Sequence, residues 1–224
     1  MGMVDWPAGE GPRDKLLGKG AEALSDAELL AILLHTGYRD CNALELARKL
    51  LGQYAGLDGV MRAQRASLLA CTGVGNAKYA RLQASLELAR RQALQVLCCS
   101  DVLSSPNETR RFLQHHLGGH TREVFSCLFL DSQHRVLRCE DLFLGTLDGA
   151  AVYPREVAVR ALQYHAAAVI FAHNHPSGVA EPSSADRRIT ERLCAALALL
   201  DIRVLDHIII GRGREYSFAE QGLL

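Results

Sequence analysis

The pattern of hydrophobic and polar positions divides this chain of 224 residues into two parts. Up to about residue 92 the pattern is helical throughout, whereas beyond residue 106 short apolar runs typical of strands alternate with helical stretches. The residues between these parts are of mixed polarity and end just before Pro106. We therefore predict an all-α domain over residues 1–92, a linker over 93–105 and an α/β domain over 106–224.

Two helix starts in the first part carry the capping-box pattern, in which a Ser or Asn cap is followed three residues later by Glu. Ser25 with Glu28 predicts a helix that continues to His35. Asn42 with Glu45 predicts a second helix that continues to about Leu51. The first domain is therefore expected to be built from short, well-capped helices.

The second part is expected to form a mixed sheet flanked by helices, an α+β arrangement within the α/β class. Its expected elements, in chain order, are a helix of about a dozen residues from Pro106 with Ser105 as its cap, a strand Val124–Leu130, a hairpin partner Val136–Cys139, a strand Leu142–Leu147, a helix Pro154–Tyr164, a core strand Ala166–Ala172, a helix from Ser183 to about Leu200, and strands Arg203–Ile210 and Glu215–Phe218.

Composition and charge narrow the class of protein. Hydrophobic residues make up 49% of the chain, enough for one or two cores, and no apolar stretch approaches a membrane span. The first residues carry Asp5 and Glu10 and lack the basic-then-apolar order of a signal peptide. The seven cysteines are scattered, without a Cys-x-x-Cys spacing, as in a protein with reduced thiols. We expect a cytoplasmic protein without membrane contact.

The segment His173–Asp186 carries the densest set of candidate chemical groups. It follows the apolar run Ala166–Ala172, and side chains two apart on a strand point to the same face. His173 and His175 are therefore expected to present two imidazoles at the end of this strand. Asp186 lies in the first turn of the next helix, from which a carboxylate can reach back. Two His and one carboxylate with an open fourth position are how a catalytic zinc is held.

Ser183 and Asp186 also fit a structural role. Their spacing is that of a capping box, in which the serine accepts from a helix amide and the acid favours the positive helix end. The two roles are compatible, because a capped first turn is a rigid place for a metal ligand. The spacing of all four groups, after a strand and before a long helix, favours a metal site with one zinc ion per chain.

The pattern His-x-His, seven residues, Ser, two residues, Asp resembles the motif of the JAMM (MPN+) metalloproteases. The form Asn174–Gly178 is similar to the bacterial RadC family, in which a JAMM domain follows a helix-hairpin-helix domain. The other similar segments are Pro12–Leu17, Leu24–Ala31, Gly73–Gly75, Pro154–Glu156 and Leu205–Ile210. The resemblance implies a helix-hairpin-helix domain and an MPN/JAMM (cytidine-deaminase-like) mixed sheet flanked by helices. It also implies that Ser183 helps to stabilise the oxyanion of a tetrahedral intermediate.

Peptide hydrolysis also needs a general base, and three glutamates are candidates. In JAMM proteins the base is a glutamate that opens the first strand, so the resemblance implies Glu123, which precedes Val124–Leu130. Glu156 lies beside Arg155 in the sequence and can form an ion pair with it. Glu140 lies near a hairpin edge, where solvated acids are common. We predict Glu123 as the base, with Glu140 and Glu156 as alternatives.

Gly73 and Gly75 mark a turn that joins a short helix to a long one. The arrangement is typical of a helix-hairpin-helix, in which the glycines permit a tight turn and leave helix N-terminal amides for a phosphate. Lys78 and Arg81 are expected to add positive charge beside them. Residues 60–92 hold six basic side chains and one acidic one, although the whole chain has a net charge of zero. These features predict weak, sequence-independent DNA contact, and such a hairpin also serves as a protein–protein module.

Two functions of different classes follow from these features. The first is a JAMM-type zinc metallopeptidase that hydrolyses a peptide or isopeptide bond in a protein substrate. The second is a nucleic-acid-binding accessory protein, associated with DNA repair, whose metal site is structural or regulatory. A structural zinc is normally closed by four protein ligands, so three ligands and a serine favour the first. The chain has no His-Glu dipeptide for an HExxH protease and no Pro-Cys-x-x-Cys for a zinc deaminase.

Overall fold

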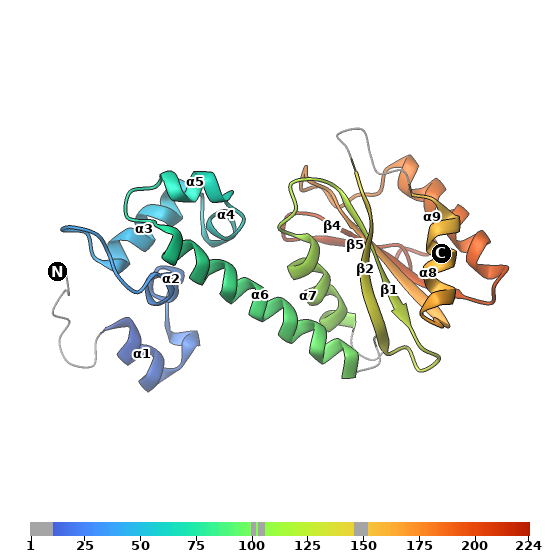
Figure 1. The fold of residues 1–224 in the computed structure, drawn as a ribbon, viewed down its shortest axis with the longest axis horizontal. Coiled ribbons are helices and arrows are strands. Elements are labelled where there is room, and N and C mark those ends of the chain that lie inside the picture. Colours follow the sequence, from blue (N-terminus) through green and yellow to red (C-terminus); the bar gives the residue numbers. More distant parts are fainter. Residues whose placement is uncertain (1–10, 100–101, 103–105, 146–151) are drawn as a thin grey trace. The chain divides into compact units, whose positions relative to one another are not determined.

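The computed structural model describes residues 11–99, 102, 106–145 and 152–224, and the chain forms two compact units (Figure 1). The first unit covers residues 1–88 and the second covers residues 89–224. The expected order, a helical part followed by a part with a mixed sheet, is confirmed. Within the described ranges, no helix is both long and apolar enough to cross a membrane.

The N-terminal unit is built of short helices around one core. They are α1 (Pro12–Lys19), α2 (Asp26–Leu34), α3 (Ala43–Gln53), α4 (Leu57–Met61), α5 (Arg65–Ala70) and the first part of α6 (Asn76–Cys99), with a 3₁₀ turn at Ala21–Ala23. Both predicted capping boxes are present, at Ser25 before α2 and at Asn42 before α3. The apolar faces meet in a core that includes the fully buried Leu34, Ala47 and Leu68. Local capping and helical patterning therefore account for this unit.

The turn between α5 and α6 is the hairpin that the two glycines predict. Gly73 has a φ of +91°, in the left-handed region that favours glycine. A Cβ atom at this position would lie 2.1 Å from a carbon of the Tyr38 ring, which packs directly on the turn. Gly75 has no such restriction, since a Cβ atom there would meet no described atom within 4 Å. Only the first glycine is therefore required by its surroundings.

We expect Gly73→Ala to lower the free energy of unfolding by about 2–4 kcal/mol, because strained backbone and overpacking against Tyr38 add together. Gly75→Ala is the matched control, and it is expected to change the free energy of unfolding by less than about 1 kcal/mol. Urea denaturation of the full chain, followed by far-ultraviolet circular dichroism, measures both changes. Equal stability of the two variants would contradict the role assigned to Gly73.

Helix α6 continues through the first part of the expected linker (93–105) and ends at Cys99, which corrects that prediction. The physical reason is the helical spacing of apolar positions beyond residue 92. Leu97 is fully buried, and Ala93 and Leu94 pack against the same core, which belongs to the second unit. The second unit therefore begins earlier than expected, at residue 89.

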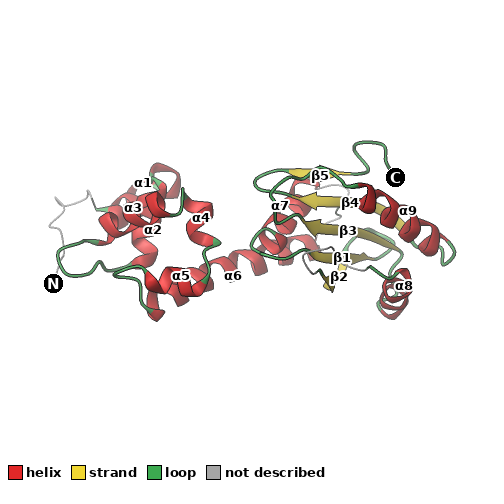
Figure 2. Ribbon diagram, turned by 90° about the horizontal axis from the view of Figure 1, so that it is seen from above, coloured by secondary structure: helices red, strands yellow, loops and turns green. Residues whose placement is uncertain are grey.

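The C-terminal unit contains a five-stranded mixed sheet in the order β2-β1-β3-β4-β5 (Figure 2). The strands are β1 (Val124–Leu130), β2 (Val136–Leu144), β3 (Ala168–Asn174), β4 (Arg203–Ile210) and β5 (Glu215–Ser217). Only the central pair β3 and β4 is parallel. The two strands expected over residues 136–139 and 142–147 are one strand as far as Leu144, because Glu140 and Asp141 stay paired with β1. Residues 146 and 147 lie outside the described ranges.

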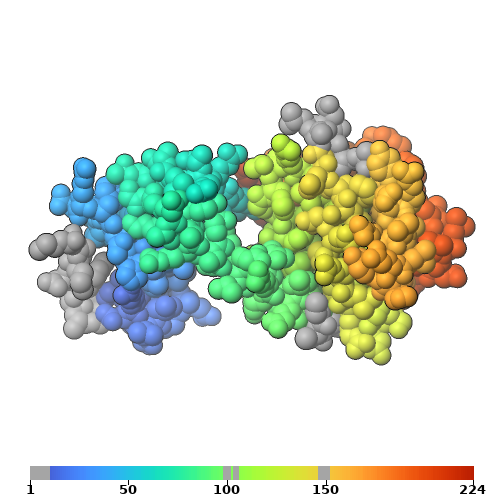
Figure 3. Space-filling model, viewed as in Figure 1, coloured from blue at the N-terminus to red at the C-terminus, as the bar shows by residue number. Residues whose placement is uncertain are grey.

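Helices cover both faces of this sheet, and each covered face has its own core. Helix α7 (Pro106–Leu117) and the end of α6 pack on one face, whereas α8 (Pro154–Gln163) and α9 (Ser184–Ala198) pack on the other. The expected cap of α7, Ser105, lies outside the described residues. Figure 3 shows the outer surface of each unit in space-filling form, in the view of Figure 1.

The alternation of side chains along β3 decides which groups reach which face. Ile170 and Ala172 lie in the core beneath α7, whereas Val169 and Phe171 lie in the core beneath α8 and α9. His173, two residues after Phe171, therefore projects on the side of α9. Asp186 lies in the first turn of α9 on that same side, so the sheet and the helix bring His173 and Asp186 together.

Candidate metal centre

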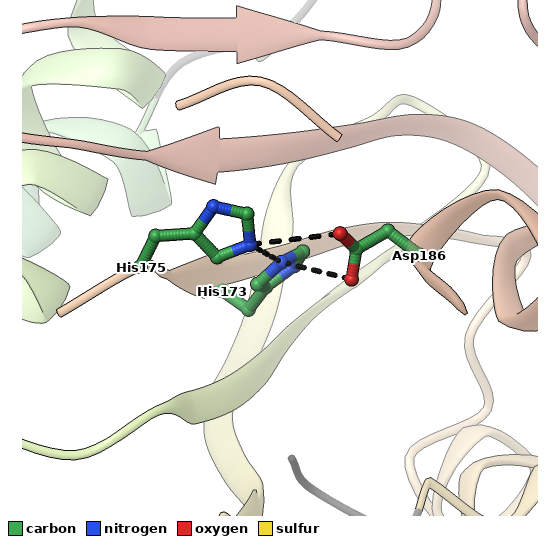
Figure 4. Close-up of side chains that lie close together, drawn as sticks. All are labelled: His173, His175 and Asp186. Carbon is green, nitrogen blue, oxygen red and sulfur yellow. Dashed lines mark hydrogen bonds and ion pairs between the residues drawn. The ribbon is translucent and has the colours of Figure 1, made fainter. Parts of the chain in front are cut away.

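Three side chains converge where β3 ends and α9 begins (Figure 4). The Nε2 atoms of His173 and His175 lie 3.0 Å apart. The Nε2 atom of His173 is 3.3 Å from Oδ1 of Asp186, and that of His175 is 3.5 Å from Oδ2 of the same carboxylate. The sequence-predicted ligands are thus brought together, and one ligand atom from each lies within 4.8 Å of the others.

Backbone structure on both sides holds these ligands in place. The amide of His175 donates to the carbonyl of Ile210 at 2.9 Å, so the parallel pairing of β3 with β4 extends to the second histidine. The Asp186 carboxylate accepts from the Ser183 amide at 2.7 Å, and the Ser183 hydroxyl accepts from the Asp186 amide at 3.1 Å. This capping box fixes the carboxylate in the first helical turn, so Asp186 is both a member of the capping box and a candidate ligand.

The charges of the cluster favour a cation among the three groups. Burial alone would raise the pKa of Asp186, but the hydrogen bonds that His173 and His175 donate when their rings are protonated on both nitrogens outweigh burial and hold the pKa well below its usual range. The hydrogen bond with Asp186 raises the pKa of His175 against the effect of burial, and the charge of Glu123 adds to this rise. A carboxylate that stays ionised beside basic ring nitrogens attracts positive charge into the space between them.

The donor set fits a tetrahedral metal ion. His175 Nδ1 donates to the carbonyl of Val179 at 2.7 Å, and because a carbonyl only accepts, its Nε2 lone pair is free for a metal. Zinc bonds of about 2.0–2.1 Å in a tetrahedron place the ligand atoms about 3.3–3.4 Å apart. The two Nε2 atoms, 3.0 Å apart, are close to that value, and each lies 3.3 or 3.5 Å from a different oxygen of the Asp186 carboxylate. One ligand atom from each residue lies within 4.8 Å of the others. The residues present could therefore hold a metal ion with few side-chain shifts.

The candidate general bases differ in their partners. Glu140 accepts from the Tyr164 hydroxyl at 2.8 Å and lies 3.5 Å from Arg160, and Glu156 forms an exposed ion pair with Arg155. Glu123 lies directly before β1 and is half-buried, and its charge acts on His175. Two of the three glutamates are thus engaged in ion pairs or hydrogen bonds within the fold.

Two family models match this chain, one over each of its two parts. A family model described as the RadC-like JAB domain matches residues 103–223, and a second, the UPF0758 N-terminal model, matches residues 3–80. The chain belongs to the RadC family. Among its relatives, UPF0758 proteins of Thioalkalivibrio sulfidiphilus and Tolumonas auensis are 57% and 56% identical over the full length of both chains. That of Nitrosococcus oceani is 57% identical, also over full length.

In this RadC chain the three side chains that could hold a metal ion lie within the JAB domain. The mixed sheet flanked by helices is the expected fold of that domain, and the resemblance to the RadC family is confirmed. The helical unit coincides with most of the UPF0758 N-terminal match.

Lys78, in the first turn of α6 after the Gly73–Gly75 turn, is not exposed as the sequence predicts. Only 8% of this lysine is exposed, and its ammonium group donates to the carbonyls of Gly73 and Gly37 at 2.7 and 3.1 Å. Burial also lowers the pKa of Lys78. Arg81 donates to the carbonyl of Leu34 at 3.4 Å. The long lysine stem packs inside the unit while its charge satisfies turn carbonyls, so Lys78 stabilises the hairpin rather than facing a phosphate.

Asn174, between the two histidines, ties the end of β3 to the start of β1. Its side-chain oxygen accepts from the Val124 amide at 2.8 Å, and its amide group donates to the carbonyls of Arg122 and His120 at 3.0 and 3.3 Å. These bonds bracket Glu123 on both sides and tie it to the strand that carries the histidines. The sequence feature that predicts this placement is strand alternation, because Asn174 follows His173 on β3 and therefore projects from the opposite face of the sheet.

We expect Asn174→Ala to lower the free energy of unfolding by on the order of 2–4 kcal/mol, because the buried Val124 amide and two carbonyls lose their partner. Asn107→Ala, an exposed position on α7, is the matched control and should change stability by less than about 0.5 kcal/mol. Thermal and urea denaturation of the full chain measure both. A variant at Asn174 as stable as the control would show that these bonds do not hold the strand ends together.

Proposed function

We propose that this RadC chain is a zinc-dependent metallopeptidase of the JAMM type, which hydrolyses a peptide or isopeptide bond in a protein substrate. The observation that carries the proposal is the convergence of His173, His175 and Asp186 within a JAB domain, with one ligand atom from each within 4.8 Å of the others. A structural zinc is normally closed by four protein ligands, whereas this cluster offers three. One zinc ion per chain, with a position left for substrate or water, fits that arrangement.

When bound, a zinc ion supplies Lewis acidity that activates water and polarises the carbonyl of the scissile bond. The chain's own residues supply proton transfer. In the proposal, Glu123 accepts the proton of the attacking water and delivers it to the leaving amine. The placement before β1, the influence of its charge on His175 and the competing contacts of Glu140 support this choice.

Ser183 is proposed to stabilise the developing oxyanion as well as to cap α9. Its hydroxyl oxygen accepts from the Asp186 amide, and this bond leaves the hydroxyl hydrogen for donation to a substrate oxygen. Ser183 is exposed on the surface of the unit, so a substrate can reach it. The cap fixes the serine backbone close to the ligands, so little reorganisation is needed on binding.

The place of action is proposed to be the cytoplasm, where thiols stay reduced. Among the described residues, Cys41, Cys71, Cys127 and Cys194 form no disulfide. Any DNA contact of the N-terminal unit is proposed to exclude Lys78, because this lysine is buried.

A peptide library tests the proposed activity. The zinc-loaded full chain is incubated with proteome-derived peptides and with lysine isopeptides, and newly formed amino termini are labelled isotopically and identified by mass spectrometry. We expect cleavage at defined bonds that disappears in the His173→Ala, His175→Ala double variant. Cleavage that is equal in both proteins, or absent from a wild-type protein with a full complement of zinc, would contradict the proposal.

A further inference from the structure

His207 and Thr190 connect the first candidate ligand back to the third through a buried chain of hydrogen bonds. His173 Nδ1 lies 2.8 Å from His207 Nε2, and His207 Nδ1 lies 2.6 Å from the Thr190 hydroxyl. The same hydroxyl lies 2.6 Å from the backbone carbonyl of Asp186, one helical turn earlier in α9. His173, His207 and Thr190 are at most 1% exposed, so water does not replace any of these partners.

The direction of every bond in this chain follows from its last member. The carbonyl of Asp186 only accepts, so the single hydroxyl hydrogen of Thr190 is donated to it. The Thr190 oxygen can then only accept from His207, which places a proton on Nδ1 of that ring. A neutral His207 with Nδ1 protonated accepts at Nε2, so His173 must donate from its own Nδ1.

The surroundings of His207 keep the ring neutral and offer it no competing partner. Its ring packs on those of Phe218, Phe125 and Phe171, with centroids 4.9, 5.4 and 6.1 Å away. The ring is fully buried, and burial disfavours the charged form of an imidazole. The two nitrogens of His207 therefore have only His173 and Thr190 as hydrogen-bond partners among the described residues.

We propose that Thr190 and His207 act as positioning residues that set the tautomer of His173, so that its Nε2 lone pair faces His175 and Asp186. The proposal rests on the metal site of the proposed function and extends it to residues that do not touch the metal. His175 reaches the same tautomer by a different contact, the Val179 carbonyl. Both imidazoles thereby have their Nε2 lone pairs available before an ion binds. We call the hydrogen-bond chain from His173 through His207 and Thr190 to the Asp186 carbonyl the relay. Asp186 thus contributes its carboxylate to the site and its carbonyl to the relay.

Thr190→Val is the informative substitution, because it keeps the shape of the side chain and removes the hydroxyl. The Nδ1 proton of His207 would then face a methyl group, and the ring is expected to carry its proton on Nε2 instead. His173 must then accept at Nδ1 and carry its proton on Nε2, which blocks the metal. Loss of such an outer partner typically weakens metal binding about 10- to 100-fold.

Two controls separate the relay from general damage to the core. Thr190→Ser keeps the hydroxyl and is expected to restore the wild-type tautomers and zinc affinity. Thr109→Val makes the same change at a buried threonine of α7 whose hydroxyl has no hydrogen-bond partner among the described residues. This variant is expected to bind zinc as the wild type does.

The test has two measurements on the full chain. Nitrogen-15 NMR of the metal-free protein at about pH 8, where a free imidazole is neutral, reports the tautomers of His173 and His207. Competition with a chromophoric chelator reports the affinity for zinc. We expect both rings to be protonated at Nδ1 in the wild type and at Nε2 in Thr190→Val, with zinc binding weakened about 10- to 100-fold in that variant.

The relay is wrong if His207 is protonated at Nε2 in the wild-type protein, a result that needs no variant to fold. It is also wrong if Thr190→Val keeps both the wild-type tautomers and the wild-type zinc affinity. Because the tautomers are read without metal, these outcomes are distinct from failure of the proposed function. A wild-type chain that shows the expected tautomers but binds no zinc would remove the zinc site and leave the relay intact.

Discussion

The double variant His173→Ala, His175→Ala is expected to purify with essentially no zinc, whereas the wild-type chain holds about one ion per molecule. Two of the three converging ligand atoms are lost, and a single carboxylate does not hold zinc against solvent competition. Inductively coupled plasma mass spectrometry of protein dialysed without chelator measures the ratio of metal to chain. Metal analysis of both proteins from the same growth medium removes differences in supply.

The matched control is the double variant His115→Ala, His165→Ala, in which two exposed histidines outside the cluster are removed. It should keep the wild-type zinc content. Chelation gives an independent readout, because an ion that binds only the folded state raises the melting temperature. We expect a chelator to lower the melting temperature of the wild type and of the control, and to leave that of the His173→Ala, His175→Ala protein unchanged. Undiminished zinc in that protein would place the metal elsewhere in the chain.

Replacement of Glu123 by Gln is expected to reduce hydrolysis by on the order of 10²–10⁴-fold while zinc content and stability stay close to wild type. The amide has nearly the shape of the carboxylate but cannot accept the proton of an attacking water. The rate is measured on a peptide identified in the library experiment, and zinc content and melting temperature are measured on the same preparation. A loss of rate with retained zinc separates proton transfer from metal binding.

Glu156→Gln is the control for this experiment, because Glu156 is an exposed acid whose partner is the neighbouring Arg155. Its hydrolysis rate should remain within about threefold of wild type, as expected when no transition-state contact is lost. Glu140→Gln weakens contacts with Tyr164 and Arg160, so we expect it to lower the melting temperature more clearly than the hydrolysis rate. A Glu123→Gln protein with full activity, beside an inactive variant at either other position, would reassign the general base.

Short-range signals allowed much of the N-terminal unit to be predicted. Both capping boxes form where Ser25 and Asn42 occur, because a cap is decided by residues only three positions apart. The glycine at position 73 likewise predicts the turn. What requires a glycine there is the close contact with the Tyr38 ring, which is distant in the sequence. Lys78 shows the limit of such reasoning, because a lysine that follows a glycine turn looks solvent-exposed until its two carbonyl partners are located.

Helix α6 and strand β2 both extend further than the local sequence pattern predicts. Residues 93–99 were expected in a linker, and they are helical because Leu97 has a core to enter. Glu140 and Asp141 interrupt the apolar pattern of β2, yet the strand continues across them, since backbone pairing with β1 does not depend on side-chain polarity. Boundaries of elements are thus decided by neighbours that local patterns do not contain.

The sequence by itself determined the candidate ligands, because His173, His175 and Asp186 are brought together by one strand, one loop and the first turn of one helix. Only the tertiary structure decided what surrounds them. Asn174 ties this strand to β1, and His207 arrives from β4 to meet His173. The physical reason is that strand alternation and helix capping act within a few residues, whereas hydrogen bonds to a ligand's far side come from strands and helices that only the folded sheet makes adjacent.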